Sequence, residues 1–437
     1  MIFSTIFVLA LAGSAFGQTA LPTTSSAQQT TVVPPVQQTT VVPPVQQTTV
    51  TAPTNPPATS PVQQTTVVTP TFIPQQQQQC STNLEGLYLD VVFILDSSKG
   101  TDPLGFNGER GALLAFASTG LVVSQTQPQA VRASIITAAT KPVVVGDLNA
   151  YNSVSDFLRA VKTLSYVSNT GPSLDLAQAL ITADNVLSTS GRGTNIQKLI
   201  VVFTSADDYD CTIENSLSQS RSHRLASDEK SPCRIAANIK NSGIYILTIR
   251  LNFNDAPNLH VNGIASPCYA LNNDEQMLPE FMKLLSWTNC YCPSSYTQNL
   301  HLTKCYKTAE CLYLEETPTG YTSAQIAAGL DNGILVDILN QDKQDFVMNM
   351  TTNYRPVFIG LNQIGSSGTW KWDTGSSFSP VGSFNKFAGN DININNKCTY
   401  LDNDGLWHDT VCSAFEKANP YIYQVSACSA GKFCAAT

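Results

Sequence analysis

Polar side chains that could ligate a cation follow a strongly apolar run near residue 90. The run 89–95 ends at Asp96, and Ser98 follows two residues later. Carboxylate and hydroxyl oxygens are the donors that hard cations such as Mg²⁺ prefer. The next alternate position is Gly100, which has no side chain to offer. Asp96 and Ser98 are therefore candidate ligands of a divalent cation.

The histidines are the candidates for catalytic chemistry. There are four of them, His223, His260, His301 and His408. None stands in a Gly-x-Ser-x-Gly, His-Glu-x-x-His or papain-like cysteine motif, with which hydrolases place a nucleophile or a metal beside a base. A histidine without a placed partner is more often a surface residue, so we expect no enzymatic activity.

The cysteines and the N-terminus indicate the compartment. All 12 cysteines lie at or after Cys80, and none forms a Cys-x-x-Cys pair. Zinc sites need clustered soft ligands, whereas extracellular chains use cysteines for disulfides. Residues 1–17 are mostly apolar, lack acidic residues and end in small ones, which is typical of a cleaved signal peptide. The apolar run is shorter than the ~20 residues of a membrane span, so we expect a secreted protein without one.

Charge argues against an anionic partner. The formal net charge is −8, and 13% of the residues are charged, about half the typical ~25%. A protein of negative net charge is repelled by nucleic acid and by anionic membrane surfaces. We expect neither as a partner.

Residues 18–79 form a Thr/Pro/Gln-rich stalk. The nine residues 28–36 recur at once as 37–45, and degraded copies begin at Gln46 and Gln63. Proline fixes an extended backbone, and β-branched Thr and Val favour the same conformation. Threonine beside proline is typical of O-glycosylated, mucin-like stalks, and an unmodified spacer is the alternative. Either form predicts a semi-rigid extender.

The elements that must position Asp96 lie in residues 80–290. Near-continuous apolar runs of this segment are typical of strands buried on both faces; they cover 89–95, 131–138, 198–204 and 244–251. Helical periodicity fills the intervals, so the alternation predicts an α/β module with a doubly wound parallel sheet. Ligands bind beyond the carboxyl ends of such strands, which is where Asp96 stands. Residues 292–437 combine two helical segments with short strands and Trp, Gly and Asn clusters, which predicts an α+β module.

The segment Phe93–Gly100, with the strand order around it, resembles the von Willebrand factor A domain. The resemblance implies a divalent-cation site on three loops that takes an acidic side chain of a partner. Asp96 and Ser98 match the first loop. Leu174 stands where the family has threonine on the second loop, with Ser173 or Asp175 as shifted alternatives. Thr204-Ser205-Ala206 replaces Thr-Asp-Gly on the third, and the carboxylates that follow are Asp207, Asp208 and Asp210.

The last third of the chain resembles the C-type lectin fold. Its landmarks occur in the family's order, namely Lys304–Lys307, Phe358–Leu361, Thr369–Trp372 and Cys398–Cys412. The resemblance implies a Ca²⁺-dependent sugar site, with Asn390 and Asp391 at one place and His408 and Asp409 at the other. The first place lacks the family's proline, and the second has histidine for asparagine. Ca²⁺ takes about six to eight oxygens, so we expect no cofactor, at most weak Ca²⁺ or Mg²⁺ binding, and metal-independent binding on this surface.

The same resemblance implies two disulfides, Cys398–Cys412 and Cys292–Cys305. Ala328 and Tyr423 fill the places of a third family bridge, so both of its partners are absent together. We also expect Cys80–Cys290, because doubly wound domains often have close termini. The pairing of the others stays open, with a bridge from the C-terminal tail to Cys311 as one alternative; they are Cys211, Cys233, Cys268, Cys311, Cys428 and Cys434.

Two further features concern the surface. Asn349-Met350-Thr351 is an N-glycosylation sequon, with Asn349 as the acceptor. Basic residues gather between Ser218 and Arg234, around a loop flanked by Cys211 and Cys233. This cluster is either a solvated loop or a patch for an anionic ligand.

These features together predict a secreted, non-enzymatic recognition or adhesion protein of the invertebrate C-type lectin family. The resemblance implies cell-surface or microbial ligands, glycan or protein, and a role in innate defence. The alternative is a structural component of mucus or extracellular matrix, in which the stalk is the functional part.

Overall fold

The computed structural model describes residues 80–81, 84–167, 171, 173–204, 211, 231–250, 263–301, 305–366, 368–375, 384–388, 395–413 and 417–434. All of them belong to the compact unit that begins at Val68. The expected signal peptide (1–17) and stalk (18–79) lie outside the described residues.

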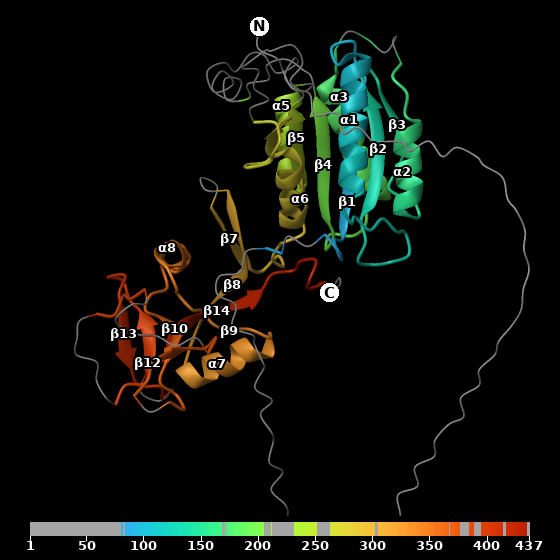
Figure 1. Cartoon of the computed structure of the whole chain (residues 1–437). Coiled ribbons are helices and arrows are strands. Elements are labelled where there is room, and N and C mark those ends of the chain that lie inside the picture. The colour runs from blue at the N-terminus through green and yellow to red at the C-terminus, as the bar shows by residue number, and fades with distance from the viewer. Residues whose placement is uncertain are drawn as a thin grey trace, which may run out of the picture. The chain divides into compact units, whose positions relative to one another are not determined.

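The first module is built on a six-stranded sheet with the order β3-β2-β1-β4-β5-β6 (Figure 1). Its strands are β1 (Leu89–Asp96), β2 (Arg132–Ala138), β3 (Pro142–Gly146), β4 (Gln197–Thr204), β5 (Tyr245–Arg250) and β6 (Ala270–Asn272). All neighbouring pairs are parallel except β2 and β3, which are antiparallel. This confirms the expected doubly wound α/β fold, with an antiparallel strand added at one edge.

Helices cover both faces of this sheet, as Figure 1 shows for α1 and α3. They are α1 (Asp102–Ala117), α2 (Val154–Thr163), α3 (Leu176–Ser190), α5 (Pro232–Asn241) and α6 (Met277–Thr288). Alternate β1 residues point to opposite faces. Val91 and Phe93 pack in one core with residues of α1, α2 and α6. Val92 and Ile94 pack in the other core with residues of α3 and α5. Burial on both faces explains why β1 is apolar along almost its whole length.

The second module is built on an eight-stranded sheet whose main path is β13-β12-β10-β14-β8-β7. Strand β11 pairs with β10, and β9 pairs with β14. The elements in chain order are β7 (Thr297–His301), β8 (Tyr306–Thr319), α7 (Tyr321–Leu330), β9 (Ile334–Leu335), α8 (Gln341–Met350), β10 (Val357–Asn362), β11 (Lys371–Trp372), β12 (Cys398–Leu401), β13 (Trp407–Thr410) and β14 (Asn419–Ser426). The pairing of early strand β8 with last strand β14 closes the module.

Strand β10 lies at the centre of this module, and all six of its residues are buried. Gly360 has a structural reason to be glycine, because a Cβ there would lie 2.5 Å from the carbonyl oxygen of Leu335. The Gly360 N–H donates to the Val336 carbonyl at 2.8 Å. The backbone crossing next to Gly360 therefore tolerates no side chain, and it fixes β10, which pairs with β12 and β14.

Candidate functional site

The loop after β1 holds Asp96 and Ser98, the two candidate metal ligands of the first module. Asp96 is fully buried, and its Oδ1 accepts a hydrogen bond from the Ser98 N–H at 2.9 Å. Backbone hydrogen bonds fix the loop on both sides, from the Ser97 N–H to Ala138 and from the Lys99 N–H to Gly171. The structure thus brings Asp96 and Ser98 together at the carboxyl end of the sheet, in a loop held by its neighbours.

Glu109 of α1 also reaches this loop. Its Oε2 accepts from the Asp96 N–H at 2.8 Å, and the residue is fully buried. Burial, and next the nearby Asp96 carboxylate, raise the pKa of Glu109 well above its usual range. A raised pKa makes a carboxyl a poorer metal ligand, because the cation must compete with a more tightly held proton. Glu109 was not predicted, because it stands between Gly108 and Arg110 in a segment that looks exposed in the sequence; only its burial identifies it.

The second loop does not complete a cation site. Leu174 is 3% exposed and belongs to the apolar core. Asp175 caps α3, since its carboxylate accepts from the Gln178 N–H at 3.0 Å. Asp207, Asp208 and Asp210 of the third loop lie outside the described residues. Within the described residues, the first two loops therefore supply too few oxygen ligands for a six-coordinate Mg²⁺ site.

The hairpin of β12 and β13 carries the predicted His408 and Asp409. His408 lies opposite Tyr400, and the two rings stack with centroids 5.5 Å apart. His408 Nε2 lies 2.9 Å from Asp404 Oδ2. Lys417 Nζ lies 4.9 Å from the centre of the Tyr400 ring. We call Tyr400, Asp404, His408 and Lys417 the hairpin patch.

Asp409 follows His408 directly in strand β13, and adjacent strand residues point to opposite faces. The hairpin therefore does not present the two side chains on one face. Asn390 and Asp391 lie outside the described residues, so the structure does not place them beside this pair. No three His, Cys, Asp or Glu side chains gather as a metal-binding group among the residues that the structure describes.

The acidic turn between β12 and β13 uses its carboxylates on its own backbone. Asp402 Oδ1 accepts from the Asn403 N–H at 2.7 Å, and Asp404 Oδ1 accepts from the Leu406 N–H at 2.9 Å. Loss of hydration raises the pKa of Asp404, but the hydrogen bonds from the Leu406 N–H and from His408 together lower it below its usual value. These carboxylates shape the turn that presents the hairpin patch.

A buried ionic cluster joins α8 to β8 and β14, and no pattern in the sequence indicates it. Lys343 Nζ donates to Asp337 Oδ1, to Glu310 Oε2 at 2.8 Å and to Gln424 Oε1 at 2.7 Å. Burial alone lowers the pKa of Lys343, but the carboxylates of Asp337 and Glu310 raise it above its usual value. Burial raises the pKa of Glu310. The ammonium of Lys343 thus offsets the negative charge that the two buried carboxyl groups would otherwise carry without a partner.

A second buried acid lies beside β10. Asp373 Oδ1 accepts from Gln325 Nε2 at 2.8 Å and from Asn362 Nδ2 at 2.7 Å. Loss of hydration raises the pKa of Asp373 to about 7, although both amide hydrogen bonds lower it. Two neutral donors do not fully replace water around a carboxylate. Asp373 therefore joins α7, β10 and the segment after β11 through a group that titrates near neutral pH.

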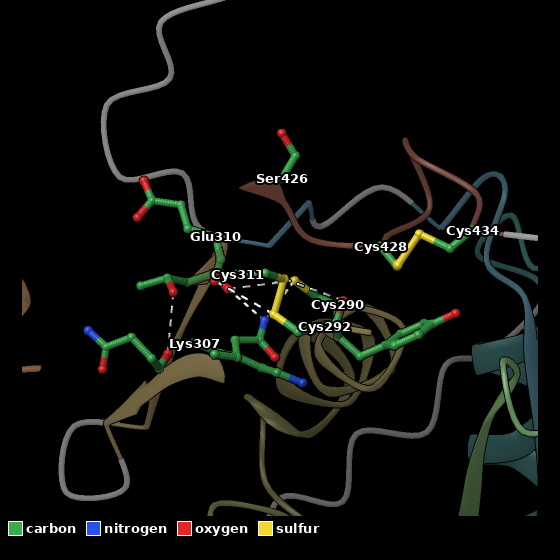
Figure 2. The surroundings of a disulfide bond; sticks show 12 residues. Cys290, Cys292, Lys307, Glu310, Cys311, Ser426, Cys428 and Cys434 are labelled. Carbon is green, nitrogen blue, oxygen red and sulfur yellow. Dashed lines mark hydrogen bonds between the residues drawn. A yellow bond between two sulfur atoms is a disulfide. The ribbon is translucent and has the colours of Figure 1, made fainter. Parts of the chain in front are cut away.

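The twelve cysteines form six disulfides, and no free cysteine remains. Cys80–Cys290 and Cys398–Cys412 are the pairs that the sequence predicts. The other four are Cys211–Cys233, Cys268–Cys305, Cys292–Cys311 and Cys428–Cys434. Figure 2 shows Cys292–Cys311 with Cys290 and the Cys428–Cys434 bridge nearby. Tyr291 and Cys428 exchange two backbone hydrogen bonds, of 3.1 and 2.9 Å, which hold the C-terminal tail to this region.

The expected bridge Cys292–Cys305 is wrong, and so is the alternative that tied the tail to Cys311. In the hairpin of β7 and β8, Gln298 lies opposite Cys311 and His301 lies opposite Tyr306. Cys311 is therefore near the open end of the hairpin, where Cys292 enters. Cys305 lies at its closed end, where it pairs with Cys268 of the first module. The register of the hairpin determines which cysteine pairs with Cys292, and the spacing of the cysteines in the sequence does not reveal that register.

The predicted loss of a family bridge agrees with the packing around Ala328 and Tyr423. Both residues are buried in one core. The Tyr423 hydroxyl donates to Asp331 Oδ2 and lies 3.2 Å from the Tyr296 hydroxyl. The rings of Tyr296, Tyr313 and Tyr423 pack against one another. An aromatic cluster thus occupies the place where the resemblance implies a disulfide.

The comparison with protein families identifies both modules. Residues 90–282 match the von Willebrand factor type A domain, and residues 320–422 match the lectin C-type domain. The chain therefore carries a von Willebrand factor A domain followed by a C-type lectin domain. Domains of these two types serve recognition and adhesion in general and are typically not enzymes.

Two curated relatives show the extent of the likeness. C-type lectin domain-containing protein 160 of Caenorhabditis elegans is 24% identical over 288 residues, which are 62% of this chain and 41% of that protein. The low affinity immunoglobulin epsilon Fc receptor of Mus musculus is 30% identical over 108 residues, which are 24% of this chain and 31% of the receptor. The chain spans less than half the length of these relatives.

Two solved structures are among the matches. The mouse scavenger receptor C-type lectin carbohydrate-recognition domain is 20% identical, with a TM-score of 0.27, and the match covers 33% of this chain and 100% of that one. Proximal thread matrix protein 1 from the mussel byssus is 15% identical, with a TM-score of 0.35, and the match covers 46% of this chain and 47% of that one. The assignment of the two domains rests on the family matches.

Two remaining features concern the surface and the membrane. Asn349 is exposed near the end of α8, where the sequon lies. The basic residues between Ser218 and Lys230 lie outside the described residues. Within the described ranges, no helix is long and apolar enough to cross a membrane.

Proposed function

We propose that this protein is secreted and recognises cell-surface or microbial glycans or proteins through the loop surface of its lectin domain, without a metal clamp. In this proposal it is not an enzyme and acts in innate defence. The general role in recognition or adhesion follows from the two domain types. The six disulfides support an oxidising, extracellular compartment. Glycosylation of Asn349 belongs to the same proposal.

One observation carries the metal-independent mode: His408 stands where the lectin family has a calcium ligand, and it is bound within the protein. It stacks on Tyr400 and contacts Asp404 at 2.9 Å. The His408 side chain is 29% exposed and that of Asp404 is 47% exposed. The patch thus offers ring surfaces and a cation at Lys417 to a ligand. Aromatic faces and charge-assisted hydrogen bonds can hold a sugar or a peptide without a metal.

Glycan-array and microbial-cell binding by the intact chain tests this proposal. We expect saturable binding that Tyr400→Ala and His408→Ala each weaken by about tenfold, which corresponds to 1.4 kcal/mol. Leu330→Ala is a matched control, because Leu330 is 80% exposed on α7 of the same domain. Binding that is unchanged in both patch variants would place the ligand surface elsewhere and overturn the proposal.

A matrix or mucus component is the second candidate, and the repeats of residues 28–67 favour it. Threonine beside proline in tandem copies is the composition of mucin-like stalks. Under this alternative, deletion of the stalk abolishes incorporation into matrix while Tyr400→Ala and His408→Ala leave it unchanged. Under the recognition proposal, ligand binding responds to the patch variants and tolerates the deletion.

A further inference from the structure

Strand β3 forms one edge of the first sheet and is unusually apolar for an edge. It ends the strand order next to β2, so one row of its backbone N–H and C=O groups has no strand partner among the residues that the structure describes. Its central residues Val143, Val144 and Val145 are 59%, 41% and 45% exposed. Proteins usually protect such edges with charges or by covering them, because an open edge templates pairing with another chain.

The irregularity of β3 adds to the exposed apolar surface. Val144 pairs with Ile136 and Gly146 pairs with Ile135, so Val145 is an extra, bulged residue. Bulges commonly weaken an edge by bending it away from partners. Here the bulged residue is itself a half-exposed valine, and the strand carries no charged residue between Pro142 and Gly146. The chain thus exposes an edge without the charges that normally discourage pairing.

The charges that flank β3 fit a second copy of the same strand. Lys141 and Asp147 lie three residues before and three residues after Val144. In an antiparallel pair related by a twofold axis at Val144, Lys141 of each copy lies opposite Asp147 of the other. Opposite charges in directly facing positions stabilise a strand pair. No cation lies within ion-pair distance of Asp147 among the described residues; its carboxylate accepts from the Asn149 N–H and from Ser190 Oγ.

We propose that two copies of this protein pair edge to edge through β3, antiparallel and about a twofold axis at Val144. The arrangement is isologous, so one patch serves both copies and the assembly closes as a dimer. The self-complementary charges favour a second copy over an unrelated extended peptide, which has no reason to carry a matching acid and base at this spacing. A five-residue strand buries less than the ~1,000 Å² of a stable interface, so we expect a weak dimer with a Kd on the order of 10–100 µM.

Such a dimer has a consequence for binding. Two lectin domains on one particle engage a multivalent surface with higher avidity than either domain alone. This consequence rests on the proposed recognition function, whereas the pairing itself does not. Loss of ligand binding and loss of dimerisation are therefore separate outcomes.

Sedimentation equilibrium of the intact chain, from about 1 to 200 µM to bracket the expected Kd, tests the pairing. Val144→Asp places two like charges at the axis, and we expect its Kd to rise at least tenfold. Leu330→Asp is the control, since it adds the same charge at an exposed apolar site outside the sheet, and it should dimerise like the unmodified chain. A chain that stays monomeric throughout, or dimers that persist in Val144→Asp, would overturn the proposal.

A charge-exchange pair tests the register directly. In a dimer of Lys141→Asp, the new aspartate of each copy lies opposite Asp147 of the other. In a dimer of Asp147→Lys, the new lysine of each copy lies opposite Lys141 of the other. Like charges then face each other in both cases, so each variant alone should be monomeric. An equimolar mixture restores both opposite-charge pairs and should dimerise again. Circular dichroism checks that Asp147→Lys folds; if it does not, Lys141→Glu alone, expected to weaken the dimer at least tenfold, takes its place. A mixture no more associated than its components, or an unweakened Lys141→Glu, refutes this register.

Discussion

Replacing Lys343 by methionine removes the ammonium group that lies between Asp337 and Glu310, while it keeps a side chain of similar length. The Lys343 side chain is 2% exposed and those of Asp337 and Glu310 are 1% and 9% exposed, so water does not replace the lost contacts. Removing one partner of a buried ion pair leaves an uncompensated charge and costs about 3–5 kcal/mol. We expect the lectin domain of Lys343→Met to lose about that much free energy of unfolding.

Urea unfolding of the intact chain, followed by tryptophan fluorescence, measures this loss. Three of the four tryptophans are buried in the lectin domain, namely Trp370, Trp372 and Trp407. With a slope of about 2 kcal/mol per molar urea, the midpoint should fall by roughly 1.5–2.5 M. Arg159→Met is the control: it breaks an ion pair with Asp156 whose arginine is 74% exposed, and we expect a change within about 0.5 kcal/mol.

The pH dependence of the free energy of unfolding is a second test of the same variant. Without Lys343, no cation among the described residues opposes the effect of burial, which raises the pKa of Glu310 in the folded state above its value in the unfolded chain. Stability then falls as pH rises through this window, because the unfolded chain binds fewer protons. Lys343→Met should therefore be less destabilised at pH 5 than at pH 8, and adding Asp337→Asn with Glu310→Gln should restore stability. A loss below about 1 kcal/mol at pH 8 would refute the view that the cluster is ionic.

Three further predictions concern the buried carboxyl groups of Glu109 and Asp373 and the pairing of the cysteines. Glu109→Gln should match or exceed the unmodified chain in thermal stability at pH 7 and lose the decline in stability that a raised carboxyl pKa causes as pH rises above about 4.3. Glu109→Ala leaves the Asp96 N–H without its acceptor and should instead lose about 1–3 kcal/mol of free energy of unfolding. Equal melting temperatures of the two variants would contradict this. For Asp373, whose pKa is raised to about 7, stability should fall between about pH 4 and pH 7, and Asp373→Asn should flatten that slope in the lectin-domain transition. Peptide mapping without reduction should yield Cys268–Cys305 and Cys292–Cys311, and recovery of a peptide joining Cys292 to Cys305 would show the hairpin register to be wrong.

The sequence predicted the strands that are buried on both faces of the sheet. Strand β1 is buried at every residue, so its apolar run is unmistakable and places Asp96 at its end. Strand β3 was not predicted, because its valines lie at an exposed edge and form no long run. The helical pattern that the sequence shows over residues 108–117 covers only part of helix α1, which begins at Asp102. The Asp102 carboxylate accepts from the Leu104 and Gly105 N–H groups there, a local cap that the apolar periodicity does not report.

Among the site residues, too, the sequence predicted some and missed those whose role depends on burial. Asp96 and Ser98 were predicted because they follow a strand directly, and the departures at Gly100 and Leu174 were visible in the sequence. Glu109 and the Lys343 cluster were not predicted, because their meaning depends on burial. Lys343 contacts Glu310 and Gln424, which are 33 and 81 residues away along the chain. No periodicity of the sequence connects groups at such separations; only the pairing of β8 with β14 does.

The most direct test of metal-independent recognition is the binding of the intact chain to a responsive glycan or microbial surface, with and without a chelator. The account predicts one saturable isotherm, with the same Kd in excess EDTA, in Ca²⁺ and in Mg²⁺, and a weakened isotherm for His408→Ala in all three. Binding that the chelator abolishes and Ca²⁺ restores would contradict it, because a cation would then hold the ligand where His408 now contacts Asp404 and Tyr400.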